Sequence, residues 1–152
     1  MNLRLRGRAL RTRVVSDGDD IRERRLEELR DTVEQFTFSL GLLLAGHDPE
    51  FGATATPELR ARLEAAVEPF LASGDAMRPD FGAYGELHVE GDLLLHDQPV
   101  TALLEFDDRS MRETADGRLL PAPRRRIRLE LRLSIQPCRI EDCAIHLLAA
   151  GR

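Results

Sequence analysis

Alternating apolar and polar residues predict a β-strand at the start of the chain. Over residues 2–15, Leu3 and Leu5 fall on one face while Arg4 falls on the other. A period of two residues is typical of an extended strand with one solvated face. The phase shifts after Ala9, and a β-bulge would account for that shift.

A short charged helix and a second strand are predicted next. Residues 20–33 place Ile21 and Leu29 near one side and charged side chains on the others, which is typical of a surface helix. Residues 35–45 return to a period of two, with Phe36 and Phe38 on one face. We therefore predict a helix over 20–33 followed by a strand over 35–45.

The second half of the chain contains one more helix and then strands. Thr56, Pro57 and Glu58 form a helix start, and Pro69 would kink or end the helix predicted over 57–72. Residues 107–123 read as a polar loop or a ragged hairpin. Alternation of apolar and polar residues predicts strands over 87–95, 100–106, 127–135 and 143–149, with a turn at 139–142.

These elements predict a single α+β domain over residues 1–152, mainly antiparallel, with about six strands and two helices. An antiparallel sheet must have one face covered. The sheet either curls and stays open, with the helix at 57–72 as its natural cover, or closes into a lipocalin-like barrel. The pattern of residues leaves both architectures open.

Charge and hydropathy exclude several classes of protein. The formal net charge is −5 and all 22 basic residues are arginine, with clusters at 1–13 and 124–128. A nucleic-acid-binding domain is normally strongly basic, so we expect these arginines on solvated faces and no nucleic-acid partner. No apolar run approaches the roughly 20 residues of a membrane span, and no apolar core of a signal peptide follows the basic start. We therefore predict a cytoplasmic protein without a membrane span.

Candidate chemistry is sparse. Cys138, Cys143 and His146 have a spacing that suits zinc only with a fourth ligand, such as His88 or His96. A disulfide across a hairpin turn is the other alternative, and two free, half-buried cysteines are the plainer interpretation in a reducing compartment. The histidines have no recognisable partners, and phosphate-binding and nucleophile motifs are absent from the sequence. We therefore predict no catalytic residue, no metal and no cofactor, and favour a protein that is not an enzyme.

Residues 89–106 read VEGDLLLHDQPVTALLEF, and this stretch resembles the hairpin of the YceI-like family, lipocalin-like proteins that bind polyisoprenoid chains. The positions that match are Gly91, Asp92, Leu93, Leu95, His96, Pro99, Val100, Thr101 and Phe106. Residues 16–38 are similar to the family's segment in which a charged helix leads into a strand ending in an aromatic residue. The turn before Pro99 is two residues shorter than in the family, and the helix at 57–72 reads as an insertion.

The resemblance implies non-catalytic binding of an isoprenoid or other lipid inside an antiparallel barrel. The residues that would line the cavity are Phe36, Phe38, Leu93, Leu95, Val100, Ala102, Leu104 and Phe106. The alternative is a solid-cored interaction module that pairs with a protein partner, or with its own copy as a homodimer, through a sheet edge. That edge would belong to the strand at 2–15 or to the last strand.

Overall fold

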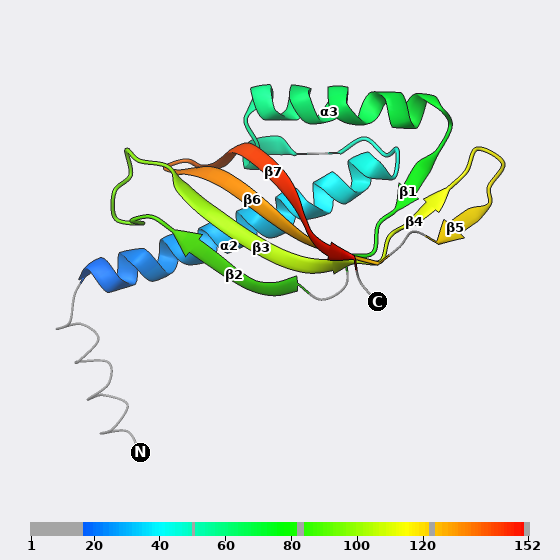
Figure 1. Ribbon diagram of the computed structural model, residues 1–152. Helices are drawn as coiled ribbons and strands as arrows, with labels where there is room; N and C mark the ends of the chain where they lie inside the picture. Colours follow the sequence, from blue (N-terminus) through cyan, green and yellow to red (C-terminus); the bar gives the residue numbers. More distant parts are fainter. Residues whose placement is uncertain (1–16, 50, 82–83, 122–123, 151–152) are drawn as a thin grey trace, which may run out of the picture.

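The computed structural model describes residues 17–49, 51–81, 84–121 and 124–150 (Figure 1). The strand predicted over 2–15 lies outside the described residues. Two long helices are present, α2 (Asp17–Leu44) and α3 (Pro57–Ala72), with a short 3₁₀ turn, η1 (Gly52–Thr54), before α3. None of the described helices is long and apolar enough to cross a membrane.

The described strands form two antiparallel sheets. The larger has the order β2 (Tyr84–Glu90), β3 (Val100–Asp108), β6 (Arg125–Ile135) and β7 (Cys138–Ala150). The smaller consists of β1 (Ala76–Arg78), β4 (Met111–Glu113) and β5 (Leu119–Pro121). The fold is α+β with a curled sheet that stays open: β2 and β7 are its two edges and do not pair, so the barrel alternative is not adopted.

The core lies between α2 and one face of the larger sheet. In α2, Leu29, Val33 and Phe36 recur every three or four residues, which places them on the side facing the strands. Alternate residues of β3 and β6 meet them, as the strand period requires. The buried strand residues are Val100, Ala102, Leu104, Phe106, Leu129, Leu131, Leu133 and Ile135. Figure 1 shows α2 running across this face, whereas α3 lies beside β7.

The prediction of a helix followed by a strand at 35–45 was wrong, because α2 is one continuous helix of 28 residues. The apolar residues of 36–44 fit a helical period as well as a period of two, since Leu42, Leu43 and Leu44 fill both patterns. The burial decides between them: Phe36 is 0% exposed, whereas Phe38 is 68% exposed. On a strand these two side chains would point the same way.

Two further boundaries differ from the predictions. The strand predicted over 87–95 ends at Glu90, and residues 91–99 form a loop. Residues 139–142, predicted as a turn, belong to β7, because the chain turns at Gln136 and Pro137 instead. Within 107–123, β4 and β5 form the hairpin that was one of the two interpretations. The helix predicted at 57–72 is confirmed, with Thr56 as its cap.

Candidate functional site: the open edge of β7

Most of the residues predicted to line a cavity lie in the packed core. Phe36, Leu93, Val100, Ala102, Leu104 and Phe106 are all buried. Leu104 and Phe106 pack beneath α2 together with Leu129 of β6. Phe38 and Leu95 are exposed on α2 and in the loop at 91–99, so they are not brought together with the others. The structure therefore places these residues in a core and on two separate surfaces.

The apolar face of the sheet continues beyond the helix that covers it. Leu104, Leu129 and Ile145 are direct neighbours across β3, β6 and β7. Leu129 is 1% exposed, but Ile145 is 59% exposed. In the next row, Leu147 of β7 is 64% exposed beside the half-buried Ile127. The apolar rows of the core thus continue onto β7, where their side chains are exposed to solvent.

The free side of β7 is covered only along its first half. The Thr56 N–H donates to the Ile140 carbonyl at 3.0 Å, and Arg62 forms an ion pair with Asp142 at 3.2 Å. From Cys143 onward, no described residue of another element hydrogen-bonds to the strand from that side. Figure 1 shows α3 and β7 diverging toward the C-terminal end of the strand. We call residues 143–148 the open edge.

The open edge has no charge and no proline, and no described element covers it. Its sequence, Cys-Ala-Ile-His-Leu-Leu, contains no charged residue, in a chain of which 32% is charged. Sheet edges are normally protected from pairing by charges, prolines or a covering element. The open edge is therefore accessible and suited to pairing.

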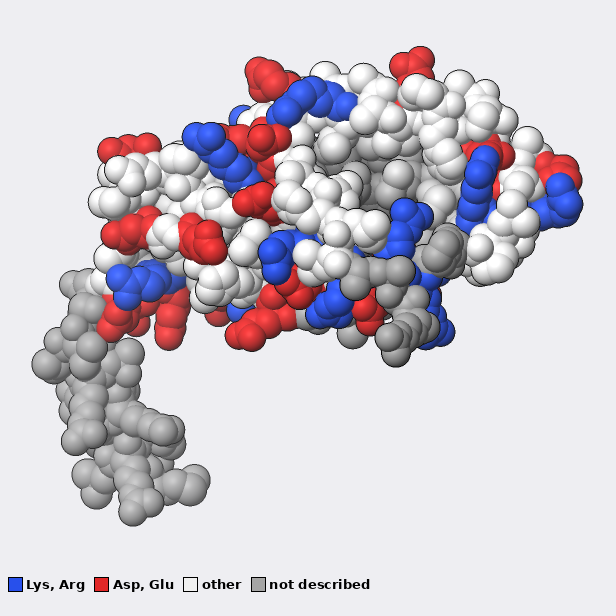
Figure 2. Space-filling view, viewed as in Figure 1, with Lys and Arg blue, Asp and Glu red and all other residues white. Residues whose placement is uncertain are grey.

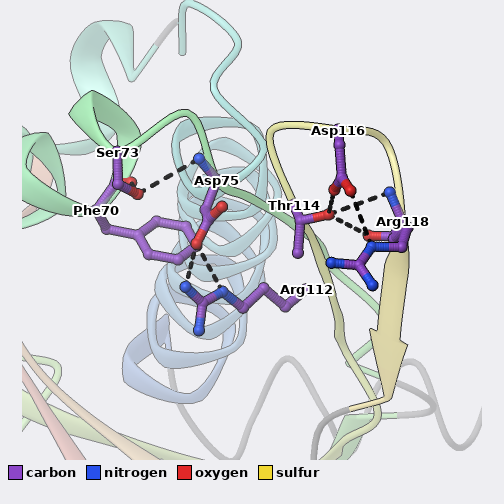
Figure 3. A network of polar contacts seen from close by, with 7 residues as sticks. All are labelled: Phe70, Ser73, Asp75, Arg112, Thr114, Asp116 and Arg118. Carbon is purple, nitrogen blue, oxygen red and sulfur yellow. Dashed lines mark hydrogen bonds and ion pairs between the residues drawn. The ribbon is translucent and has the colours of Figure 1, made fainter.

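The small sheet contacts the end of α3 and the residues that follow it. Arg112 of β4 forms an ion pair with Asp75, and its guanidinium lies 5.9 Å from the centre of the Phe70 ring (Figure 3). At the turn of the β4–β5 hairpin, Arg118 forms an ion pair with Asp116 at 2.9 Å. The contacts of Arg112 link the hairpin to the segment that follows α3, whereas the Arg118–Asp116 ion pair lies within the hairpin turn.

The outer face of the sheet is a network of ion pairs. Arg128 and Arg126 both bind Glu105, at 2.6 and 3.4 Å, and Arg126 also binds Asp107 at 3.0 Å. The hydrogen bond from Arg128 lowers the pKa of the Glu105 carboxyl. Arg126 and Arg128 of the basic cluster at 124–128 are therefore occupied within the chain, as expected for a solvated face.

The two cysteines and His146 do not converge on one point. Cys138 and Cys143 are free thiols packed against the core, whereas His146 lies on the outer face, 2.9 Å from Glu130. The described residues contain no group of three or more ligands that could hold a metal ion. Burial raises the pKa of the Cys138 thiol, and raises that of Cys143 from 9.0 to about 11. Neither thiol is activated as a nucleophile.

The buried Cys143 thiol predicts that stability falls in alkaline solution. Folded Cys143 keeps its proton up to about pH 11, whereas the unfolded thiol ionises near 9.0. The unfolded state therefore binds fewer protons between these values, and the free energy of unfolding should drop by about 2–3 kcal/mol as the pH rises through them. Urea unfolding at several pH values measures this drop. Cys143→Ala should remove most of it; an equal drop in that variant would contradict the assignment.

A concave region lies between the C-terminal half of α2 and the segment of β1, beneath α3 in the view of Figure 2. It has a volume of about 680 Å³ and is lined by both apolar and charged side chains. Phe38, Leu42 and Met77 supply apolar surface, while Arg78 and Glu113 form an ion pair at 3.0 Å. The groove is large enough for a small molecule.

Comparison with known proteins shows the fold and no family. No family model matches the chain, and no curated protein matches it. The intermembrane space region of the chloroplast protein ARC6 has a similar structure, with a TM-score of 0.51 and 8% identity over 78% of this chain and 93% of that one. A protein from Catenulispora acidiphila aligns with a TM-score of 0.36 and 14% identity over 90% of this chain and 93% of that one. The first likeness indicates a shared fold.

Sequence reasoning had indicated the last strand as one of two candidate docking edges, but not which of its residues are exposed. Ile145 and Leu147 were missed because their alternation with Ala144 and His146 resembles that of any half-buried strand. The absence of charge over 143–148 was the signal that could have identified the open edge.

Proposed function

We propose that this protein is a non-catalytic interaction module that binds an extended strand of a partner along the open edge of β7. The observation that carries the proposal is the exposure of Ile145 and Leu147 on the uncharged open edge of β7, which pairs with core residues of β6 on one side and with no described strand on the other. A strand added there would pair the free backbone groups and extend the sheet. It would also cover the two apolar side chains, each of which contributes about 1–2 kcal/mol when buried.

A peptide selection tests this function directly. A library of displayed ten-residue peptides is selected on the immobilised protein, and the affinities of the enriched peptides are measured by fluorescence anisotropy. We expect uncharged, β-branched-rich sequences that bind in the micromolar range, as strand addition favours. Leu147→Lys should weaken their binding about tenfold, because it places a charge where an apolar side chain must be covered.

Leu95→Lys is the matched control, because Leu95 is also an exposed leucine but lies in the loop at 91–99. This variant should bind the selected peptides as the unmodified protein does. Peptides that are insensitive to Leu147→Lys, or a selection without enrichment, would contradict the proposed function.

A second candidate function is the binding of a small apolar molecule, as the resemblance to YceI-like proteins implies. The groove of about 680 Å³ beside Phe38 favours it, although that groove is outside the sheet and not a barrel interior. A stoichiometric lipid that co-purifies and is detected by native mass spectrometry would support this function. For either function we propose a cytoplasmic location, because two free cysteines are typical of a reducing compartment.

A further inference from the structure

We infer that the strand bound at the open edge is β7 of a second copy of this chain, paired antiparallel about a two-fold axis at Ile145. The inference rests on the proposed function and adds the partner and the register. Closed two-fold dimers are the commonest oligomers, and each copy contributes the same surface patch to them.

The backbone of β7 determines where the axis lies. Pairing with β6 is regular from Asp142 to Leu147, with a register shift on either side. Within that run the Cys143 N–H donates at 2.9 Å to the Asp142 carboxylate, which is paired with Arg62 of α3 on the free side of the strand. Because the backbone groups of successive residues point alternately to the two sides of a strand, Cys143, Ile145 and Leu147 face the free side. Ile145 is the middle one of the three.

The side chains match about this axis. Residues directly opposite in an antiparallel pair share a face, so the two-fold axis must pass through a residue and not between two. With the axis at Ile145, this residue meets its own counterpart, and Cys143 meets Leu147 of the second copy on the inner face. On the outer face Ala144 meets His146 of the second copy. Every inner-face pair is apolar, and each outer-face pair joins a small residue to a larger one.

The charges of the chain also permit this pairing. The open edge has no charged residue, so no like charges meet along the paired strands. The nearest acid, Asp142, is already in an ion pair with Arg62 and would lie opposite Leu148 of the second copy. Like charges placed opposite each other would oppose association. No like charges therefore oppose the pairing of two copies along this edge.

Pairing would join the apolar rows of the two copies. The row formed by Leu104, Leu129 and Ile145 would continue through Ile145 of the second copy into the same row of that molecule. Thr56 and α3 occupy the free side of β7 as far as Asp142 (Figure 1), so the paired segment would be residues 142–148 of each copy, and the second copy's chain would turn away after Leu148, where its register with β6 shifts. The two larger sheets would then form one continuous sheet.

Sedimentation velocity over a concentration series tests the partner. The unmodified chain should show a monomer–dimer equilibrium. Ile145→Lys should raise its dissociation constant at least about tenfold, because two lysines would meet at the axis. Phe38→Lys makes the same change at an exposed apolar residue on α2 and should leave the equilibrium unchanged. Circular dichroism confirms that both variants are folded, as expected for changes at exposed positions.

Oxidation of single-cysteine variants tests the register. With Cys138 and Cys143 replaced by alanine, Ile145→Cys should form a disulfide-linked dimer, because the two copies of residue 145 would lie within the Cα separation that a disulfide spans. His146→Cys should not, because residue 146 faces residue 144 of the second copy. Cross-linking at 146 in place of 145 would overturn the register.

A chain that stays monomeric, or a dimer insensitive to Ile145→Lys, would overturn the inference. The peptide selection is carried out at chain concentrations well below those of the sedimentation series. It distinguishes failure of the inferred partner from failure of the proposed function. If peptides still bind at the open edge, the proposed function stands with a different partner; if neither peptides nor a second copy binds there, both fail.

Discussion

Phe36→Ala is expected to lower the free energy of unfolding by about 3–5 kcal/mol, which is the usual cost of removing a buried aromatic side chain. Phe36 is fully buried, and its ring lies 5.6 Å from that of Phe51. The substitution leaves a cavity between α2 and η1 that the rigid elements around it cannot fill. Urea unfolding followed by circular dichroism measures the change.

Phe38→Ala is the matched control, two residues along the same helix. Its side chain is mostly exposed, so the substitution should change the free energy of unfolding by less than about 1 kcal/mol. The contrast between the two variants tests the helix itself. Similar losses at both positions would indicate the strand at 35–45 that the alternation of residues predicted, and would contradict the continuous α2.

Gly91→Ala is expected to destabilise the protein by about 2–4 kcal/mol for two independent reasons. Gly91 has φ +122°, a conformation that residues with a side chain rarely adopt. A Cβ at this position would also lie 2.9 Å from the Val100 side chain, which is buried at the start of β3. Thermal and urea unfolding should show both a lower midpoint and a lower free energy of unfolding.

Gly117→Ala separates the two causes. Gly117 also has a positive φ, +84°, but nothing lies within 4 Å of its added Cβ. This variant should therefore lose only about 1–2 kcal/mol through backbone strain. If Gly91→Ala costs no more than Gly117→Ala, the close approach to Val100 does not constrain the loop at 91–99.

The sequence alone predicted the fold class and most of the sheet. The strict alternation of Leu129, Leu131 and Leu133 with charged residues predicted β6, because this pattern fits only a strand with one dry face. The same argument located β3 and the sheet-facing positions on it. Thr56 and Pro57 located the start of α3, because a cap and a first-turn proline act through local backbone chemistry that needs no tertiary contact.

The tertiary structure alone decided three features. It resolved residues 35–44 as helix, because their apolar residues satisfy two periods and only packing against the sheet selects one. It left the sheet open, because closure depends on whether the edge strands meet, which no local pattern encodes. It also determined that α2 covers Leu104 and Leu129 but leaves Ile145 and Leu147 of β7 exposed. The exposure of the open edge follows from the placement of a helix distant in sequence, so the residues of β7 could predict a strand but not its free side.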